Sequence, residues 1–314
     1  MLLDALDCDE LTGGDGTLSL RPGTCYRSNP MTLHNASTDC FSNGSLGIGS
    51  PLSDQAERQV DSYVDTFETR GDSYNAASAI SESARNTERD LLIQLMDVDK
   101  QHVVCDAPAG GGYLADGLRG LLDRSEQLVC VEPSKTFAKP LSPDYTIFNS
   151  SISEMPVGEE TFDRIGSLAG LHHVYDKLRF FKEAARTLKP GGLVVIGDVR
   201  TRTSVAKFLN GPVDRFTLSG HTGMFLRPDE YSRGFEKAGL EPVLEQVHHF
   251  NWRFQSIDQM VDYCKSLFGM VKATRSQVKT ELYKHFDIES DAGQVMMPWS
   301  LVYGVGRKKS ATAF

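Results

Sequence analysis

The chain has 314 residues, of which 40% are hydrophobic and 24% are charged, and its formal net charge is −9. This length is enough for one large α/β domain with an appendage, or for two small domains. The composition excludes a wholly disordered chain, and no apolar run reaches the roughly 18 residues that a membrane-spanning helix needs. Nucleic acid is not expected as the main partner, because phosphate contacts need clusters of Lys and Arg.

The six cysteines indicate a reducing compartment. No two of them form a C-x-x-C pair and no histidine follows at zinc-finger spacing, so a structural zinc site is not expected. The first residues include Asp4 and Asp7, whereas a secretory signal peptide begins with basic residues. We therefore expect a cytoplasmic protein.

Residues 1–56 differ in texture from the rest of the chain. They are rich in glycine turns and carry seven acidic residues against two arginines, without a sustained helical or strand period. Such a segment buries too little apolar surface to offset the entropy lost on ordering. The sequence therefore predicts a disordered extension over residues 1–56 and a folded domain over residues 57–314.

The predicted elements begin with a helix that starts at Ser53, where apolar residues recur at helical spacing. A second helix is predicted over about residues 78–96, and short apolar strands then alternate with helices. The predicted strands cover residues 103–105, 128–131, 145–148, 164–168, 193–196, 240–250 and 299–306. The further predicted helices cover residues 114–122, 176–188, 228–238 and 256–268.

This alternation indicates the fold class. The early strands are short runs of Val, Ile and Leu without polar alternation, as in a parallel sheet buried on both faces. We expect an α/β fold, a Rossmann-like doubly wound and mostly parallel sheet with helices on both faces. Residues 200–227 and 251–297 are expected to form a helical lid over its carboxyl end.

The glycine run at residues 110–112 is the most informative segment. It lies between a strand that ends at Asp106 and a predicted helix, where open α/β sheets bind ligands. Glycine allows the backbone to turn tightly and to approach a ligand closely. Glu132, at the end of the next strand, suits a pair of ribose hydroxyls. The same spacing matches a dinucleotide fingerprint, so a nicotinamide cofactor is an alternative.

Asp106 favours one of these two cofactors. A carboxylate at the end of the first strand would repel a pyrophosphate, but it suits a ligand with a cationic amine and a sulfonium. The alternative is that Asp106 only caps the following turn, which is a common use of aspartate.

Residues 106–112 resemble the first motif of class I S-adenosylmethionine-dependent methyltransferases, in which an acid precedes a glycine loop. Four further segments resemble later motifs in the family's order, and they cover residues 131–134, 150–156, 162–174 and 188–193. The resemblance is nearest to the small-molecule branch, methyltransferase type 11, which includes the ubiquinone and menaquinone C-methyltransferases. It extends over about residues 60–200.

The resemblance implies methyl transfer from S-adenosyl-L-methionine to an O, N or C atom of a small molecule by in-line displacement. The cofactor-binding residues that it implies are Asp106, Ala107, Pro108, Gly110, Gly112, Glu132, Pro133, Ser151, Ile152, Ser167 and Leu168. Two of these depart from the family pattern: Pro108 stands where a glycine is usual, and Ser151 replaces the acid of the adenine-contacting turn.

The pair His172 and His173 is the candidate for proton transfer. The resemblance places the pair near the transferred methyl group, and an imidazole can accept a proton near neutral pH. Alternatively, one of the rings only caps the end of the strand. His248 and His249 lie in a strand-like run, so their side chains face opposite ways and cannot bind one metal ion together. No metal site is predicted.

The predicted lid suggests the kind of acceptor. Trp252, Phe254, Phe268 and Met270 indicate apolar and aromatic walls. Arg200, Arg202 and Arg253 are candidates for binding a carboxylate, although arginines at such positions are more often solvated.

Two other functions are open at this point. One is an NAD(P)-dependent oxidoreductase on the same glycine loop, although no Tyr-x-x-x-Lys pair for hydride transfer is evident. The other is a non-catalytic, cofactor-binding partner subunit, for which Pro108 and Ser151 are the support. The sequence leaves the acceptor, the methylated atom and the oligomeric state open.

Overall fold

The computed structural model describes residues 51–291 and 293–310, with side chains from Tyr63 onward, and the statements below refer to this part of the chain. The predicted disordered extension lies outside the described residues, apart from residues 51–56, which belong to the first helix.

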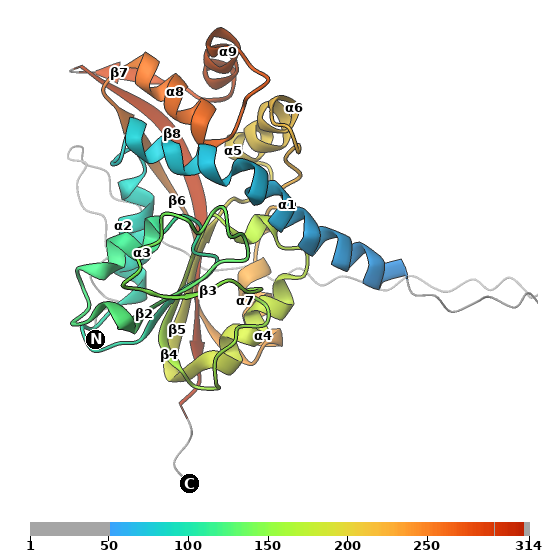
Figure 1. Ribbon diagram of the computed structural model, residues 1–314, viewed down its shortest axis with the longest axis vertical. Coiled ribbons are helices and arrows are strands. Elements are labelled where there is room, and N and C mark those ends of the chain that lie inside the picture. The colour runs from blue at the N-terminus through green and yellow to red at the C-terminus, as the bar shows by residue number, and fades with distance from the viewer. Residues whose placement is uncertain (1–50, 292, 311–314) are drawn as a thin grey trace, which may run out of the picture. The chain divides into compact units, whose positions relative to one another are not determined.

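An eight-stranded sheet with the order β3-β2-β1-β4-β5-β8-β6 runs through the molecule, and β7 pairs with β8 (Figure 1). Strands β1 to β5 are mutually parallel, while β8 lies antiparallel between β5 and β6. The strands are β1 (Val104–Asp106), β2 (Leu128–Val131), β3 (Thr146–Phe148), β4 (Phe162–Leu168), β5 (Leu188–Asp198), β6 (Leu240–Phe254), β7 (Glu289–Asp291) and β8 (Gln294–Lys308). This confirms the predicted mostly parallel, Rossmann-like sheet.

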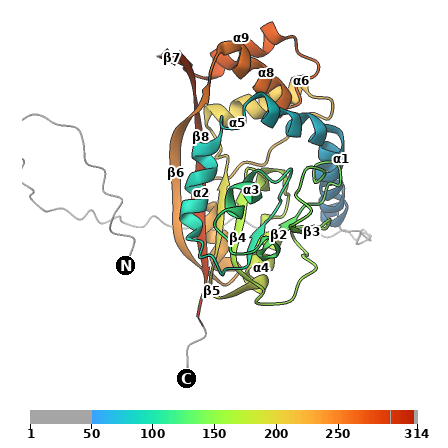
Figure 2. The same cartoon turned by 60° about the vertical axis from the view of Figure 1, so that its left-hand side comes forward.

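Helices cover both faces of the sheet, and a further group lies at one end of it (Figures 1 and 2). The helices are α1 (Pro51–Ile80), α2 (Asn86–Met96), α3 (Tyr113–Arg119), α4 (Lys177–Thr187), α5 (Ser204–Phe208), α6 (Asp214–Phe216), α7 (Glu230–Lys237), α8 (Ile257–Leu267) and α9 (Arg275–His285). Among the described residues, no helix has both the length and the apolar character of a membrane span.

The two faces of the sheet form separate hydrophobic clusters. Val104 in β1 packs with the side chains of α2 and α3, whereas its neighbour Cys105 packs with those of α4 and α7. Strands β1 and β2 are buried at every position, because helices cover them from both sides. This burial explains why their sequences are continuous apolar runs.

The structure differs from the sequence prediction at the first two helices. Helix α1 continues to Ile80, and α2 begins at Asn86 instead of near residue 78. Residues 81–85 form turns between them, and Arg85 leaves the helical conformation with φ −105° and ψ 7°. The Arg85 guanidinium bonds Glu88 and Tyr74 there, so side-chain contacts decide where α2 begins.

Candidate active site

A cavity lies at the carboxyl ends of β1, β4 and β5 and encloses about 880 Å³ of space, including its opening. The glycine loop and the turn after β4 form one side of it. The inner face of α1 and residues of β6, α8 and β8 form the rest.

The glycine loop adopts the conformation that its sequence requires. Gly110 and Gly112 have φ values of 52° and 95°, in the left-handed region that favours glycine. Asp106 lines the cavity, is almost wholly buried, and accepts a hydrogen bond from the Ala115 amide at 3.0 Å. Burial raises the pKa of this carboxyl well above its ordinary value. Asp106 therefore both caps α3 and presents an acid to the cavity.

Glu132 lies beneath the loop and is fully buried. Its carboxylate accepts hydrogen bonds from the amides of Gly110 and Ser134, both at 2.8 Å, and from the Tyr63 hydroxyl at 3.1 Å. Burial raises its pKa to about 7, and these hydrogen bonds oppose the rise. Helix α1 thus reaches the carboxylate on which the ribose is expected.

The predicted cofactor residues divide into two groups. Asp106, Pro108, Gly110 and Leu168 line the cavity. The others are not among the residues that line it, and they are Ala107, Gly112, Glu132, Pro133, Ser151, Ile152 and Ser167. Ser151 is exposed, whereas Ile152 packs in the hydrophobic cluster that includes α4. Their contacts with a cofactor stay predictions.

His172 has a buried acidic partner that the sequence analysis missed. Its Nδ1 lies 2.6 Å from Oδ1 of Asp198, the last residue of β5. Asp198 is fully buried and also accepts hydrogen bonds from the amides of His172, at 2.9 Å, and Val199, at 2.6 Å. These bonds fix the carboxylate, and the carboxylate orients the imidazole, as in catalytic acid–histidine pairs.

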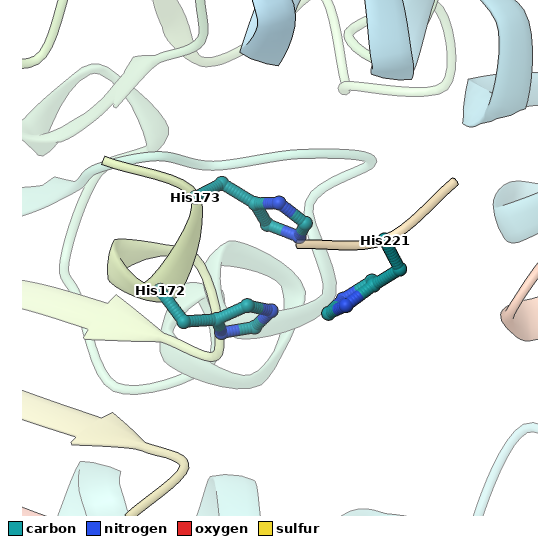
Figure 3. Close-up of side chains that lie close together, drawn as sticks. All are labelled: His172, His173 and His221. Carbon is teal, nitrogen blue, oxygen red and sulfur yellow. The ribbon is translucent and has the colours of Figure 1, made fainter. Parts of the chain in front are cut away.

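A third histidine joins the predicted pair. His221, from the loop after α6, turns its ring toward His172 and His173 (Figure 3). One ring nitrogen from each of the three lies within 4.8 Å of the others. Burial, followed by the neighbouring His172, lowers the pKa of His173 and of His221 well below the ordinary value, so both rings are neutral at pH 7.

The wall opposite the glycine loop is aromatic. Trp252 stacks on Trp299 with ring centroids 4.1 Å apart, and Phe268 lies 6.0 Å from Trp299. Of the four predicted wall residues, Trp252 and Phe268 line the cavity, while Phe254 and Met270 are buried elsewhere in the core.

The cavity also holds a buried arginine. Arg70 of α1 is 7% exposed, and its Nη2 donates to the Phe268 carbonyl at 2.9 Å. Its Nε and Nη1 are buried and find no hydrogen-bond partner among the described residues. Burial lowers its pKa to about 10, so it is charged at neutral pH. By contrast, the three arginines predicted for a carboxylate lie outside the cavity lining, at Arg200, Arg202 and Arg253.

Arg70, Asp198 and His221 are thus site residues that sequence reasoning did not select. Each lies far along the chain from the motif it meets in space, and no local spacing marks it. The one available signal was the apolar spacing around Arg70, which predicts a buried helix face and hence an unusual place for a charge.

Comparisons with known proteins agree with this architecture. The family described as "Methyltransferase domain" matches residues 105–196. The 27-O-demethylrifamycin SV methyltransferase of Amycolatopsis mediterranei is 27% identical over 149 residues, which are 46% of this chain and 54% of that enzyme. The demethylmenaquinone methyltransferase of Bacillus cereus is 27% identical over 217 residues, which are 60% of this chain and 90% of the relative.

The chain thus spans about half the length of the rifamycin relative. Among solved structures, the YcgJ protein of Bacillus subtilis shares the fold, with a TM-score of 0.53 and 18% identity over 72% of this chain and all of that one. Residues 105–196 match the methyltransferase domain family, and the strand order of the sheet agrees with this match.

Proposed function

We propose that the protein transfers a methyl group from S-adenosylmethionine to an O, N or C atom of a small, anionic acceptor. One observation carries the proposal: a single cavity joins the family's glycine loop and Asp106 to the histidine pair and to Arg70. A cytoplasmic, biosynthetic setting is part of the proposal, and the free, buried thiols of Cys105, Cys130 and Cys264 support it.

The residues present fit the cofactor. Asp106 is a buried acid at the cavity wall whose pKa is raised by burial, and a bound amine or sulfonium would supply a positive charge that favours its ionised form. The Glu132 carboxylate can accept hydrogen bonds from ribose hydroxyls when its hydrogen bond from the Tyr63 hydroxyl is broken. When bound, S-adenosylmethionine supplies an electrophilic methyl group on a sulfonium.

The protein's own part in the reaction is to position the acceptor and to exclude water. The aromatic wall of Trp252, Phe268 and Trp299 holds the body of the acceptor, and positioning of this kind can supply about 7–11 kcal/mol of a reaction barrier. Where the acceptor atom carries a proton, the proton passes to His172 Nε2, because Asp198 already accepts from Nδ1. His173 is the second candidate for this role.

Arg70 indicates the charge of the acceptor. Two of its guanidinium nitrogens are buried without partners among the described residues, and a buried unpaired charge is unfavourable. A carboxylate that enters the cavity would accept a hydrogen bond from one of these nitrogens and balance the charge. The acceptor is therefore an acid with an apolar or aromatic body.

Calorimetric titration of the purified protein with S-adenosylmethionine, S-adenosylhomocysteine and NADH tests the proposal. We expect micromolar binding of both adenosyl ligands, weakened at least about tenfold by Asp106→Asn. The exposed Asp123→Asn is the matched control and should leave binding unchanged. Binding of NADH alone would favour the oxidoreductase, and no binding of any of the three would favour the partner subunit.

Methyl transfer itself needs a second measurement. Release of S-adenosylhomocysteine is followed with a panel of aromatic and aliphatic acids and with their methyl esters. Turnover with acids and none with the esters supports the anionic acceptor. Turnover with the esters alone contradicts it while leaving the cofactor assignment intact.

A further inference from the structure

We propose that His172, His173 and His221 bind one divalent transition-metal ion of the Zn²⁺ type, and that an oxygen pair of the acceptor completes its coordination. The three rings face a common point (Figure 3), and one nitrogen from each lies within 4.8 Å of the others. Imidazole suits such ions, and three histidines with an open position are a known type of reactive zinc site.

The hydrogen bonds around two of the rings engage Nδ1 and leave Nε2 available to another ligand. Asp198 holds Nδ1 of His172 at 2.6 Å, which directs Nε2 away from the carboxylate. His221 Nδ1 lies 3.1 Å from Asn210 Oδ1. That amide cannot be turned over, because Oδ1 accepts from the Gly223 amide at 2.7 Å while Nδ2 donates to the Gly223 carbonyl at 2.9 Å.

His221 therefore carries its proton on Nδ1 and offers the lone pair of Nε2. A carboxylate or amide behind a histidine is the usual support of a metal ligand, because it fixes the tautomer and the ring orientation. Here both kinds of support are present, although Asp198 and Asn210 come from different segments of the chain.

The backbone also fastens the two histidine-bearing segments together. The Met224 amide donates to the His172 carbonyl at 2.8 Å, and the His221 amide donates to Asp214 Oδ1 at 2.7 Å. His173 is held by the rings of Phe67 and Tyr63, whose centroids lie 5.0 and 6.0 Å from its own. The three rings are thus positioned by packing and hydrogen bonds before any ion binds.

The spacing requires only a small adjustment. Nitrogens at about 2.05 Å from a tetrahedral ion are about 3.3 Å apart. The observed limit of 4.8 Å closes to this value if each ring moves by less than about 1 Å toward the centre. Rotation about the side-chain torsions covers such a distance without a change of backbone.

Charge selects the remaining ligand. The Arg70 guanidinium lines the same cavity as the three histidines, so its positive charge opposes a metal cation there. An acid that places its carboxylate between Arg70 and the ion removes this repulsion. An acceptor with a carboxylate and a neighbouring hydroxyl or keto oxygen is therefore expected to bind cooperatively with the metal.

Coordination of the ion by the acceptor rests on the proposed function, whereas binding of the ion by the three histidines does not. When the ion is bound, His172 is a ligand and Asp198 its positioning residue. Coordination would lower the pKa of the acceptor hydroxyl, and its proton would then pass to solvent at the opening of the cavity and not to an imidazole. The assignment also differs from the sequence-based prediction of no metal site, which considered the cysteines and the pair His248 and His249 but not His221.

Titration of the chelator-treated full chain with Co²⁺ tests the metal site, with the visible absorption of the ion as the readout. We expect one Co²⁺ per chain with a tetrahedral-type spectrum. His221→Ala and His172→Ala should weaken binding at least about 100-fold, and Asn210→Ala about 10- to 100-fold. The exposed His249→Ala is the matched control and should bind as the unchanged protein does.

Equal Co²⁺ binding by His221→Ala and His249→Ala, or no binding by the unchanged protein, would overturn the proposal. Far-UV circular dichroism and S-adenosylhomocysteine titration of each variant show whether it is folded. A folded His221→Ala that keeps the adenosyl ligand but loses Co²⁺ supports the metal site. If the unchanged protein binds Co²⁺ but does not bind S-adenosylhomocysteine, the methyltransferase proposal fails and the metal site stands.

Salicylate and benzoate test the coupling, because only salicylate has a hydroxyl beside its carboxylate. Salicylate should shift the Co²⁺ spectrum and tighten Co²⁺ binding at least about tenfold, and benzoate should not. Equal effects of the two acids, or none, would contradict an oxygen pair on the metal. Arg70→Met should abolish the tightening by salicylate while leaving Co²⁺ bound.

Discussion

The Tyr63 hydroxyl donates to both carboxylate oxygens of Glu132, at 3.3 and 3.1 Å, and so ties α1 to the end of β2. One turn later Phe67 stacks on Phe137, with centroids 4.7 Å apart and an angle of 13° between the rings. Phe137 in turn lies against Gly110. Helix α1 therefore covers the place where the adenosine of the cofactor is expected, and we expect the cofactor to compete with Tyr63 for Glu132.

Tyr63→Phe should tighten the binding of S-adenosylhomocysteine. The variant keeps the ring and its packing but frees the Glu132 oxygens for the ribose, and the loss of one hydrogen bond to a charged group corresponds to up to about tenfold in affinity. Calorimetric titration measures the change, and Tyr283→Phe on the exposed face of α9 is the control. Weaker binding by Tyr63→Phe would mean that the hydroxyl contacts the cofactor directly.

Glu132 should make stability fall as pH rises. Its pKa moves from 4.5 in the unfolded chain to about 7 in the folded protein, so between these values the folded state binds more protons than the unfolded state. The stabilisation by the neutral carboxyl is complete below pH 4.5 and is lost as the pH passes 7. The difference corresponds to about 3 kcal/mol.

Glu132→Gln removes this titration. The free energy of unfolding of both proteins is measured in urea at several pH values between 5 and 8. It should fall more steeply with pH in the unchanged protein than in Glu132→Gln, because the other titrating groups contribute equally to both. Parallel curves would show that Glu132 titrates near its ordinary pKa despite its burial.

Much of the fold was predictable because its signals are local. Strand β2 was predicted with its observed bounds, since a fully buried parallel strand must be a continuous apolar run. Helix α9 was missed because it buries only Val278 and Leu282, which leaves a weak apolar pattern. The break between α1 and α2 was predicted too early along the chain, because the Arg85–Glu88 contact is made inside the folded core.

The site residues likewise divide into those that a local motif predicts and those that it does not. Asp106 and Gly110 lie within a contiguous motif, and both line the cavity. His221 and Arg70 enter the site from elements whose sequences carry no motif, so their roles depend on tertiary packing alone. Gly110 also shows a limit of motif reasoning. A Cβ there would lie 2.8 Å from the Phe137 ring, so a bulky residue would disturb packing whether or not a cofactor binds.

Arg70→Met should raise the stability of the ligand-free protein and remove the binding of anionic acceptors. Methionine has a similar length and no charge, and burial of the unpaired guanidinium nitrogens is unfavourable by about 1–3 kcal/mol. Thermal unfolding and acceptor titration measure the two effects, and S-adenosylhomocysteine affinity should stay within about twofold. A destabilised variant would mean that the bond from Nη2 to the Phe268 carbonyl outweighs the unpaired charge.

A buried ion pair adjoins the aromatic wall, and its arginine, Arg85, also lines the cavity. Glu88 is wholly buried, accepts from Arg85 Nε at 2.5 Å and from Trp252 Nε1 at 3.0 Å, and so connects α2 to the cavity. Arg85 also donates to the Tyr74 hydroxyl at 2.6 Å and lies over the Trp252 ring, 5.3 Å from its centroid. Burial raises the pKa of Glu88, and Arg85 opposes the rise.

Glu88→Gln should destabilise the protein by about 3–5 kcal/mol, because it leaves the buried Arg85 charge without a counter-charge. The double variant Arg85→Met with Glu88→Gln removes both charges and should recover most of that loss. Urea unfolding of the two single variants and the double variant forms a thermodynamic cycle. Additive losses would show that the two charges do not depend on each other, and that Glu88 matters only as the acceptor for Trp252.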